Sequence, residues 1–247
     1  MIRFTPFLSV IASGRPGYNF SDPFDCDVYM VETGDGLVLV DAGVGPRGDA
    51  PLEAIRQCGY QPGDVCKILL THGHADHSGN ALYLHQQTGA PVYAHPQCAR
   101  YITEGDTEAI ALGGAIRAGL YPADYQFRAC PVNPIQDGET FTLGNTRWTA
   151  INTPGHCSGH MAYLMECRGR GYLFAGDSIF VGGKVHLQNI WDCSITDYAQ
   201  TAETLLKLPF DALLPSHFGI DLSEGKSHVE KAAQIFRNLS VPPQVCR

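Results

Sequence analysis

The sequence predicts an α/β protein in which two β-sheets pack together with helices on the outside. Short apolar runs typical of strands are followed by a segment of helical spacing, and this order of strands and a helix occurs twice along the chain. The 247 residues are 44% hydrophobic and 17% charged, which suits a sizeable core and excludes disordered, coiled-coil and collagen-like chains. No linker rich in glycine, proline or serine interrupts the chain, so we expect residues 1–247 to form a single domain.

The first half of the chain opens with a hairpin signal. Apolar runs at 27–31 and 37–40 flank a Thr-Gly-Asp-Gly turn, which is typical of two antiparallel strands. The helical spacing of apolar residues predicts a helix over 51–59, and the segment Lys-Ile-Leu-Leu predicts a buried strand over 67–70. We then expect a helix over 78–87 with Ser78 as its N-cap, a strand over 91–94, and irregular helix over 99–125.

The second half of the chain returns to strands. We expect strands over 141–143, 148–152, 161–165, 172–175 and 212–214, and helices over about 197–208 and 224–239. Polar residues with metal-binding side chains follow several of these strands directly.

Charge and cysteine content narrow the classes of function. The net charge of −8, without a basic stripe, argues against nucleic-acid binding, and no apolar run reaches the length of a membrane span. Nine scattered cysteines without a close pair are typical of reduced thiols in a cytoplasmic protein. Because Pro6 interrupts the apolar stretch near the N-terminus, we do not expect a secretory signal. We therefore expect a small-molecule substrate and leave open a homodimer.

A cluster of histidines is the most informative feature of the sequence. His72, His74, Asp76 and His77 follow the predicted strand 67–70 directly. Imidazole and carboxylate are ligands for zinc, iron and manganese. Alternation places His72 and His74 on one side of an extended turn, while Asp76 and His77 open the next helix and face a second position. This spacing favours two adjacent metal ions over one.

Three further metal-binding residues lie downstream, each on a loop that follows a strand. These residues are His156, Asp177 and His217. Strand-end loops are where a rigid scaffold holds functional residues. With the histidine cluster they supply five histidines and two aspartates, a set that ordinary surface residues or helix capping by Asp76 do not explain.

Other polar residues have simpler interpretations. Asp41, at the end of the strand 37–40, is either a turn residue or a partner that orients a metal ligand. Isolated histidines are usually surface residues, and we expect none of the remaining five to be a ligand, although His95 or His160 is a candidate for supporting the ligands. The remaining histidines are His85, His95, His160, His186 and His228.

The ordered set of H-x-H-x-D-H at 72–77, His156, Asp177 and His217 resembles the metallo-β-lactamase superfamily, from residue 27 to about residue 238. The resemblance implies an αββα sandwich of two mixed β-sheets, with helices on both outer faces and the metal ions at one edge of the sheets. It also implies that His72, His74 and His156 bind one metal ion. Asp76, His77 and His217 would bind the second ion, and Asp177 would bridge both.

Within that superfamily, residues 173–183 look most like the glyoxalase II (hydroxyacylglutathione hydrolase) branch. Only thirty residues follow His217, enough for one helix, whereas that branch carries a C-terminal helical domain. Acyl-homoserine lactonases have a tyrosine where Phe180 stands, and the Gly-Arg-Thr-Asp segment of the persulfide dioxygenases is missing. The acyl group and the leaving group therefore stay open.

The resemblance implies a dinuclear metal-dependent hydrolase that cleaves an ester-like bond, in a thioester, lactone or ester, by attack of a metal-bridging hydroxide. Two divalent metal ions are expected, with zinc first and iron or manganese as alternatives, and Asp76 and Asp177 are the expected catalytic carboxylates. The alternatives are a mononuclear-iron oxidation like that of persulfide dioxygenases, β-lactam hydrolysis, and a non-catalytic metal-binding scaffold.

Three segments, at 16–24, 100–125 and 184–192, are expected to line the substrate pocket. The aromatic residues in these segments suggest a partly apolar substrate, and the Lys184 ammonium group could hold a carboxylate tail. The candidate substrate-binding residues are Tyr18, Phe20, Lys184, His186 and Trp191.

Overall fold

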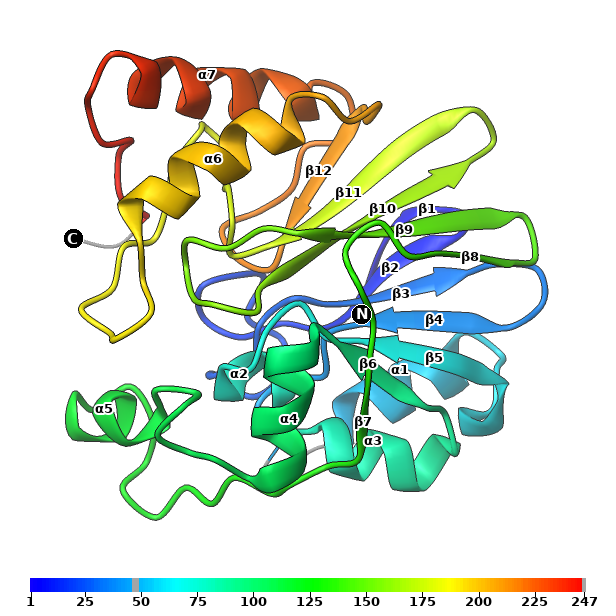
Figure 1. Cartoon of the computed structure of the whole chain (residues 1–247). Helices are drawn as coiled ribbons and strands as arrows, with labels where there is room; N and C mark the ends of the chain where they lie inside the picture. Colours follow the sequence, from blue (N-terminus) through cyan, green and yellow to red (C-terminus); the bar gives the residue numbers. More distant parts are fainter. Residues whose placement is uncertain (46–48, 246–247) are drawn as a thin grey trace. The chain divides into compact units, whose positions relative to one another are not determined.

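The computed structural model describes residues 1–45 and 49–245, which form two compact units, Met1–Ile135 and Gln136–Arg247. Each unit contains one mixed β-sheet with helices (Figure 1). The expectation of a single domain over residues 1–247 stays a prediction.

Unit 1 is built on a seven-stranded sheet whose strands lie in chain order. Neighbours are antiparallel from β1 to β4 and parallel from β4 to β7. The strands are β1 (Ile2–Thr5), β2 (Leu8–Ala12), β3 (Val28–Glu32), β4 (Leu37–Val40), β5 (Val65–Leu69), β6 (Val92–Ala94) and β7 (Val132–Pro134). Because β4 and β5 are parallel, their carboxyl ends meet at the same edge, and Asp41 N donates to Leu69 O at 2.8 Å.

Helices of unit 1 pack on this sheet, with α1, α3 and α4 against its strands (Figure 1). The apolar faces of these helices join Met30, Leu39 and Ile68 in one buried core. The helices are α1 (Ala50–Gln57), the 3₁₀ turn η1 (Pro62–Asp64), α2 (Ala75–Ser78), α3 (Ala81–Thr88), α4 (Pro96–Glu104) and α5 (Leu112–Arg117).

Several predicted elements of unit 1 are confirmed and one is wrong. The hairpin exists as β3 and β4, closed by Thr33 N donating to Gly36 O at 3.0 Å. Ser78 is not an N-cap. It ends the short helix α2, where its hydroxyl donates to Gly73 O at 2.9 Å, and Asn80 is the residue before α3. The strands β1, β2 and β7 were not predicted.

Unit 2 is built on a five-stranded sheet in the order β12-β11-β10-β9-β8. The β8–β11 ladder is antiparallel, and β12 is parallel to β11. The elements are β8 (Thr140–Leu143), β9 (Thr146–Asn152), β10 (Met161–Cys167), β11 (Arg170–Gly176), α6 (Ile195–Leu205), β12 (Ala212–Pro215) and α7 (Gly225–Arg237). All of these were predicted with shifted ends. Helices α6 and α7 lie side by side (Figure 1) and share a buried core with Leu173 and Leu213.

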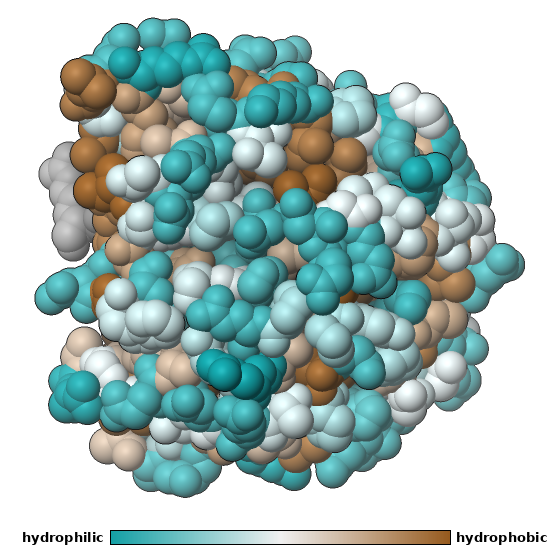
Figure 2. Space-filling view, in the orientation of Figure 1, coloured by the Kyte–Doolittle hydropathy of each residue, from teal (hydrophilic) through white to brown (hydrophobic). Residues whose placement is uncertain are grey.

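The face drawn in Figure 2 is mostly hydrophilic, with hydrophobic residues at its upper left near the end of α7. Within the described residues, no helix combines the length and the apolar character that crossing a bilayer requires. The eight described cysteines are in the thiol form, as expected from their scattered positions, and Cys246 lies outside the described residues.

Candidate metal centre

In unit 1, the expected ligands follow β5 on the edge where Asp41 also lies. Asp41 is fully buried and has a left-handed backbone, with φ 63°. Its Oδ1 accepts from Thr71 N at 2.7 Å and from the Thr71 hydroxyl at 2.9 Å. These bonds fix the first residue of the histidine segment against the end of β4. Asp41 thus contacts the residue that precedes His72, and its role as a partner that orients a metal ligand stays a prediction.

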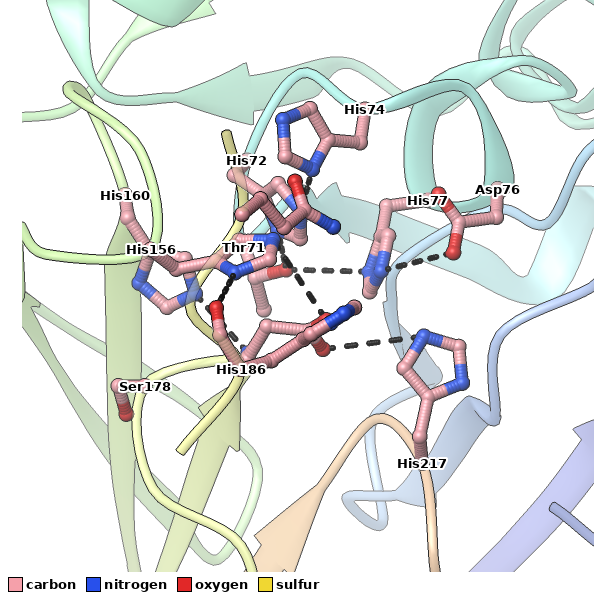
Figure 3. Close-up of polar contacts among 12 residues, drawn as sticks. Thr71, His72, His74, Asp76, His77, His156, His160, Ser178, His186 and His217 are labelled. Atoms are coloured by element: carbon pink, nitrogen blue, oxygen red, sulfur yellow. Dashed lines mark hydrogen bonds and ion pairs between the residues drawn. The ribbon is translucent and has the colours of Figure 1, made fainter. Parts of the chain in front are cut away.

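His72 and His74 approach each other through their ring nitrogens. His72 Nε2 lies 3.0 Å from His74 Nδ1, and His72 Nδ1 lies 3.0 Å from the Thr71 hydroxyl (Figure 3). Two nitrogens at about 2.0–2.1 Å from one tetrahedral zinc ion would lie about 3.4 Å apart. The pair thus has close to the spacing of two ligands on one metal ion.

His77 and Asp76 form the second group of unit 1, on helix α2. His77 Nδ1 lies 2.9 Å from Asp41 Oδ2. The other ring nitrogen, Nε2, lies 3.4 Å from Asp76 Oδ2 (Figure 3) and is the one that a metal ion would meet. Asp76 is held in turn by Tyr121, whose hydroxyl donates to Asp76 Oδ1 at 2.9 Å. Burial, followed by the Asp76 charge, raises the pKa of Tyr121 well above its ordinary value, so the hydroxyl remains a donor.

In unit 2, Asp177 turns one carboxylate oxygen toward each of two histidines. Asp177 Oδ2 lies 3.6 Å from His156 Nε2, and Oδ1 lies 3.8 Å from His217 Nε2. All three side chains are buried. Each residue follows the end of a strand, as expected from the sequence: His156 follows β9, Asp177 follows β11 and His217 follows β12.

The backbone of Asp177 is held by two residues outside the expected ligand set. Asp177 N donates to His160 Nε2 at 3.0 Å, so His160 carries its proton on Nδ1, 2.8 Å from the Thr153 hydroxyl. The Tyr198 hydroxyl lies 3.1 Å from Asp177 O and 3.1 Å from His186 O. Gly155 allows α6 to approach this closely, since a Cβ atom at Gly155 would lie 2.7 Å from the Tyr198 ring.

The candidate substrate residues have different surroundings. The ring of His186 offers a nitrogen within 4.8 Å of ligand atoms of His156 and Asp177, and His186 O lies 3.2 Å from His156 Nδ1. Lys184 is exposed on the same loop, and Trp191 is 60% exposed. In unit 1, Tyr18 packs on Phe4, with ring centroids 5.6 Å apart. Phe20 is half-buried on the same turn as Tyr18.

Sequence reasoning missed the roles of Thr71, Tyr121 and Tyr198, and considered His160 only as a candidate for support. Thr71 was detectable, because it stands between a strand and the histidines. Tyr121 and Tyr198 lie far along the chain from Asp76 and Asp177, and no local pattern connects them.

The sequence matches the metallo-beta-lactamase superfamily over residues 21–217, and the chain belongs to this superfamily. Curated relatives support a metal-dependent hydrolase. The probable metallo-hydrolase YqgX of Bacillus subtilis (strain 168) is 26% identical over 80% of this chain and 86% of its own length. An acyl-coenzyme A thioesterase of Bos taurus is 28% identical over 78% of this chain and 72% of its own length.

Several hydroxyacylglutathione hydrolases are also similar to the chain, as expected from the glyoxalase II-like segment. The hydrolase of Chelativorans sp. (strain BNC1) is 27% identical over 78% of this chain, and the match spans 61% of that relative. The chain thus spans less than two thirds of the length of this relative.

Solved structures share the fold over nearly the whole chain. A metallo-beta-lactamase from Cronobacter sakazakii has a TM-score of 0.73 at 21% identity and covers 96% of this chain and 95% of its own. A metallo-beta-lactamase family protein of Thermus thermophilus has a TM-score of 0.73 at 22% identity, covering 95% of this chain and 80% of its own. The predicted fold class, with two mixed sheets and helices, is confirmed.

Proposed function

We propose that this protein is a dinuclear metal-dependent hydrolase of ester-like bonds, with thioesters as the first substrate class. His72, His74 and His156 bind the first ion, Asp76, His77 and His217 bind the second, and Asp177 bridges both. The observation that carries the proposal is the placement of the two Asp177 oxygens toward His156 and His217, as a bridging carboxylate requires.

The donor set fits such a centre. A neutral imidazole binds a metal ion through one nitrogen while the other bonds a fixed acceptor. His77 meets this condition through Asp41, and His156 meets it through His186 O. Nitrogen and carboxylate ligands together suit zinc first, with iron and manganese as alternatives. The nitrogen and carboxylate ligands thus support a centre of two divalent metal ions.

When bound, such ions lower the pKa of water to about 7 and polarise a carbonyl oxygen, so no serine or cysteine nucleophile is needed. The protein's own contribution is to fix the positions of the carboxylates of Asp76 and Asp177. Tyr121 fixes Asp76 with one oxygen toward His77, and His160 with Tyr198 fixes the backbone of Asp177. The two carboxylates then orient the attacking water and accept its hydrogen bonds.

The substrate class rests on relatives as well as on residues. An acyl-coenzyme A thioesterase and hydroxyacylglutathione hydrolases are among the similar proteins, and both names describe thioester cleavage. We propose that Lys184 and His186 contact the substrate close to Asp177, since both follow it on one loop. Trp191, Tyr18 and Phe20 are proposed to contact its apolar part.

A panel of thioesters, lactones, esters and β-lactams, tested with protein loaded with zinc, iron or manganese, decides the proposal. We expect thioester hydrolysis that a chelator abolishes, and two metal ions per chain. The variant Asp177→Asn should lose both metal and turnover, whereas the exposed Asp124→Asn should keep them. One iron per chain with oxygen uptake would favour the oxidation instead, and metal binding without turnover would favour a scaffold.

A further inference from the structure

Outside the expected ligand set, His228 on α7 and Asp221 form a hydrogen-bonded pair. His228 Nε2 lies 3.0 Å from Asp221 Oδ2. The other ring nitrogen, Nδ1, accepts from the backbone N–H of Gly182 at 3.1 Å. Both side chains are largely buried, with exposed fractions of 16% for His228 and 25% for Asp221. The imidazole therefore bridges a carboxylate and a loop backbone.

These contacts define the state of the ring. A backbone N–H can only donate, so Nδ1 carries no proton and the neutral imidazole carries its proton on Nε2, which donates to Asp221. Asp221 is held as a carboxylate, because the backbone N–H groups of Glu224 and Ser223, and then His228, lower its pKa to about 2. The pair thus has one defined direction of hydrogen bonding.

The two partners of His228 lie on two different loops that carry expected metal ligands. Gly182 follows Asp177 on the loop after β11. Asp221 closes the loop after β12 that contains His217, because Asp221 and Leu213 exchange backbone hydrogen bonds of 2.7 and 3.0 Å. His228 is therefore bonded to the loops of both Asp177 and His217.

Close packing supports the same connection. Gly183 has φ 69°, and a Cβ atom there would lie 2.7 Å from His228 O and 3.0 Å from Ala232 N on α7. A turn at Phe180, whose N–H donates to Lys184 O at 2.9 Å, keeps the loop folded against the helix. The loop after Asp177 thus lies directly on the backbone of α7.

We propose that Asp221 and His228 are positioning residues of the metal centre, which tie the Asp177 loop to the His217 loop and fix the spacing of these two ligands. The inference rests on the proposed function, in which Asp177 and His217 bind the same ion. The 3.8 Å between Asp177 Oδ1 and His217 Nε2 is the distance that this tie maintains. Neither residue touches the reacting atoms.

Two substitutions of His228 separate its two hydrogen bonds. His228→Gln can still donate to Asp221 but loses the acceptor for Gly182, whereas His228→Asn can keep the acceptor and loses the donor to Asp221. The exposed Glu230→Gln on the same helix is the matched control. Thermal unfolding of each metal-free variant identifies any variant that fails to fold.

The readout is the metal centre itself, measured by chelator competition with Zn²⁺ and by the absorption spectrum of the Co²⁺ protein. We expect at least tenfold weaker binding of one ion and an altered Co²⁺ spectrum in both His228 variants, as for other residues that orient metal ligands. Glu230→Gln should match the wild type. A purely structural role would lower the melting temperature but leave the spectrum of the folded variants unchanged, and that result would overturn the inference.

Nitrogen NMR of the metal-free protein adds an independent test, since it reports the ring tautomer. The His228 signal, assigned by its loss in His228→Asn, should be that of the neutral Nε2–H form, and an Nδ1–H form would overturn the inference. A wild-type protein that binds no metal would overturn the proposed function and this inference with it. Wild-type binding with unchanged His228 variants would overturn this inference alone.

Discussion

At the scale of single residues, Asp41 combines two demands that few side chains meet together. Its left-handed backbone, with φ 63°, favours aspartate, asparagine or glycine. Its two oxygens accept from Thr71 and His77 in a fully buried position, where a negative charge needs such donors. The residue therefore couples the shape of the β4 end to the orientation of a proposed metal ligand.

Substituting Asp41 by asparagine tests this coupling. Asp41→Asn keeps the backbone conformation. Its single side-chain oxygen would accept from Thr71 N, which leaves the NH2 group, a donor, facing His77 Nδ1 where an acceptor is needed. The metal-binding orientation of His77 is then lost. We expect metal affinity to fall roughly 10–100-fold, as for other residues that orient ligands. Chelator competition measures this, with the exposed Asp35→Asn as control. Unchanged affinity in Asp41→Asn would show that His77 does not depend on Asp41.

The exposed Lys184 side chain gives a prediction about substrate charge. Lys184→Ala should raise KM for carboxylate-bearing substrates and largely spare kcat, because a tail-binding ammonium group does not take part in bond cleavage. Neutral esters and metal content should stay nearly unchanged. Steady-state kinetics on matched neutral and anionic substrates measure the effect. An equal effect on both kinds of substrate would remove Lys184 from the substrate site.

At the scale of elements, the loop between β2 and β3 is fixed by buried carboxylates. Asp25 Oδ1 accepts from Val44 N at 2.8 Å, and its Oδ2 accepts from the Ser21 hydroxyl at 2.6 Å. Burial is the main reason why the pKa of Asp25 is raised to about 6, against the hydrogen bonds that lower it. The loop that carries Tyr18 and Phe20 thus contains a pH-sensitive carboxyl group.

A raised pKa has a definite sign for stability. Between about pH 4 and pH 6 the folded protein binds the Asp25 proton more tightly than the unfolded chain does, so the free energy of unfolding falls as the pH rises. We expect this loss to reach up to about 3 kcal/mol. Urea unfolding of the wild type and of Asp25→Asn over this range measures how the free energy of unfolding depends on pH, and the wild type should lose more of it as the pH rises. A larger loss in Asp25→Asn would contradict the raised pKa of Asp25.

Elements with a clear pattern were predictable from the sequence, and those without one were not. The β3–β4 hairpin and the strands before His156, Asp177 and His217 have strong apolar runs next to turn residues. By contrast, β7 contains Asn133 and Pro134 and is typical of a loop, and the apolar run of β2 was considered only as a secretory signal. The strand ends indicated where the expected ligands lie in the fold, whereas the hydrogen bonds of Tyr121, Tyr198 and His228 depend on tertiary packing that no local spacing encodes.

At the scale of the whole molecule, metal binding at the proposed centre should stabilise the folded chain against unfolding. A ligand that binds only the folded state adds about 2.7 kcal/mol at a free concentration 100-fold above its Kd. We expect chelation to lower the melting temperature by several degrees and added Zn²⁺ to restore it. Calorimetry measures this, and in Asp177→Asn the effect of chelation should be much smaller.

The order of strands also has a consequence for how the chain assembles in time. Strands β2, β3 and β4 pair as antiparallel neighbours across shorter connections, whereas β12 reaches β11 only after residues 177–211 have closed back in parallel. Because distant contacts form more slowly than local ones, we expect amide protection in β2–β4 before β12 during refolding, as measured by pulsed hydrogen exchange. During synthesis on the ribosome, the histidine segment would then fold well before His217. His217, which follows β12, would therefore be the last of the proposed metal ligands to reach its position.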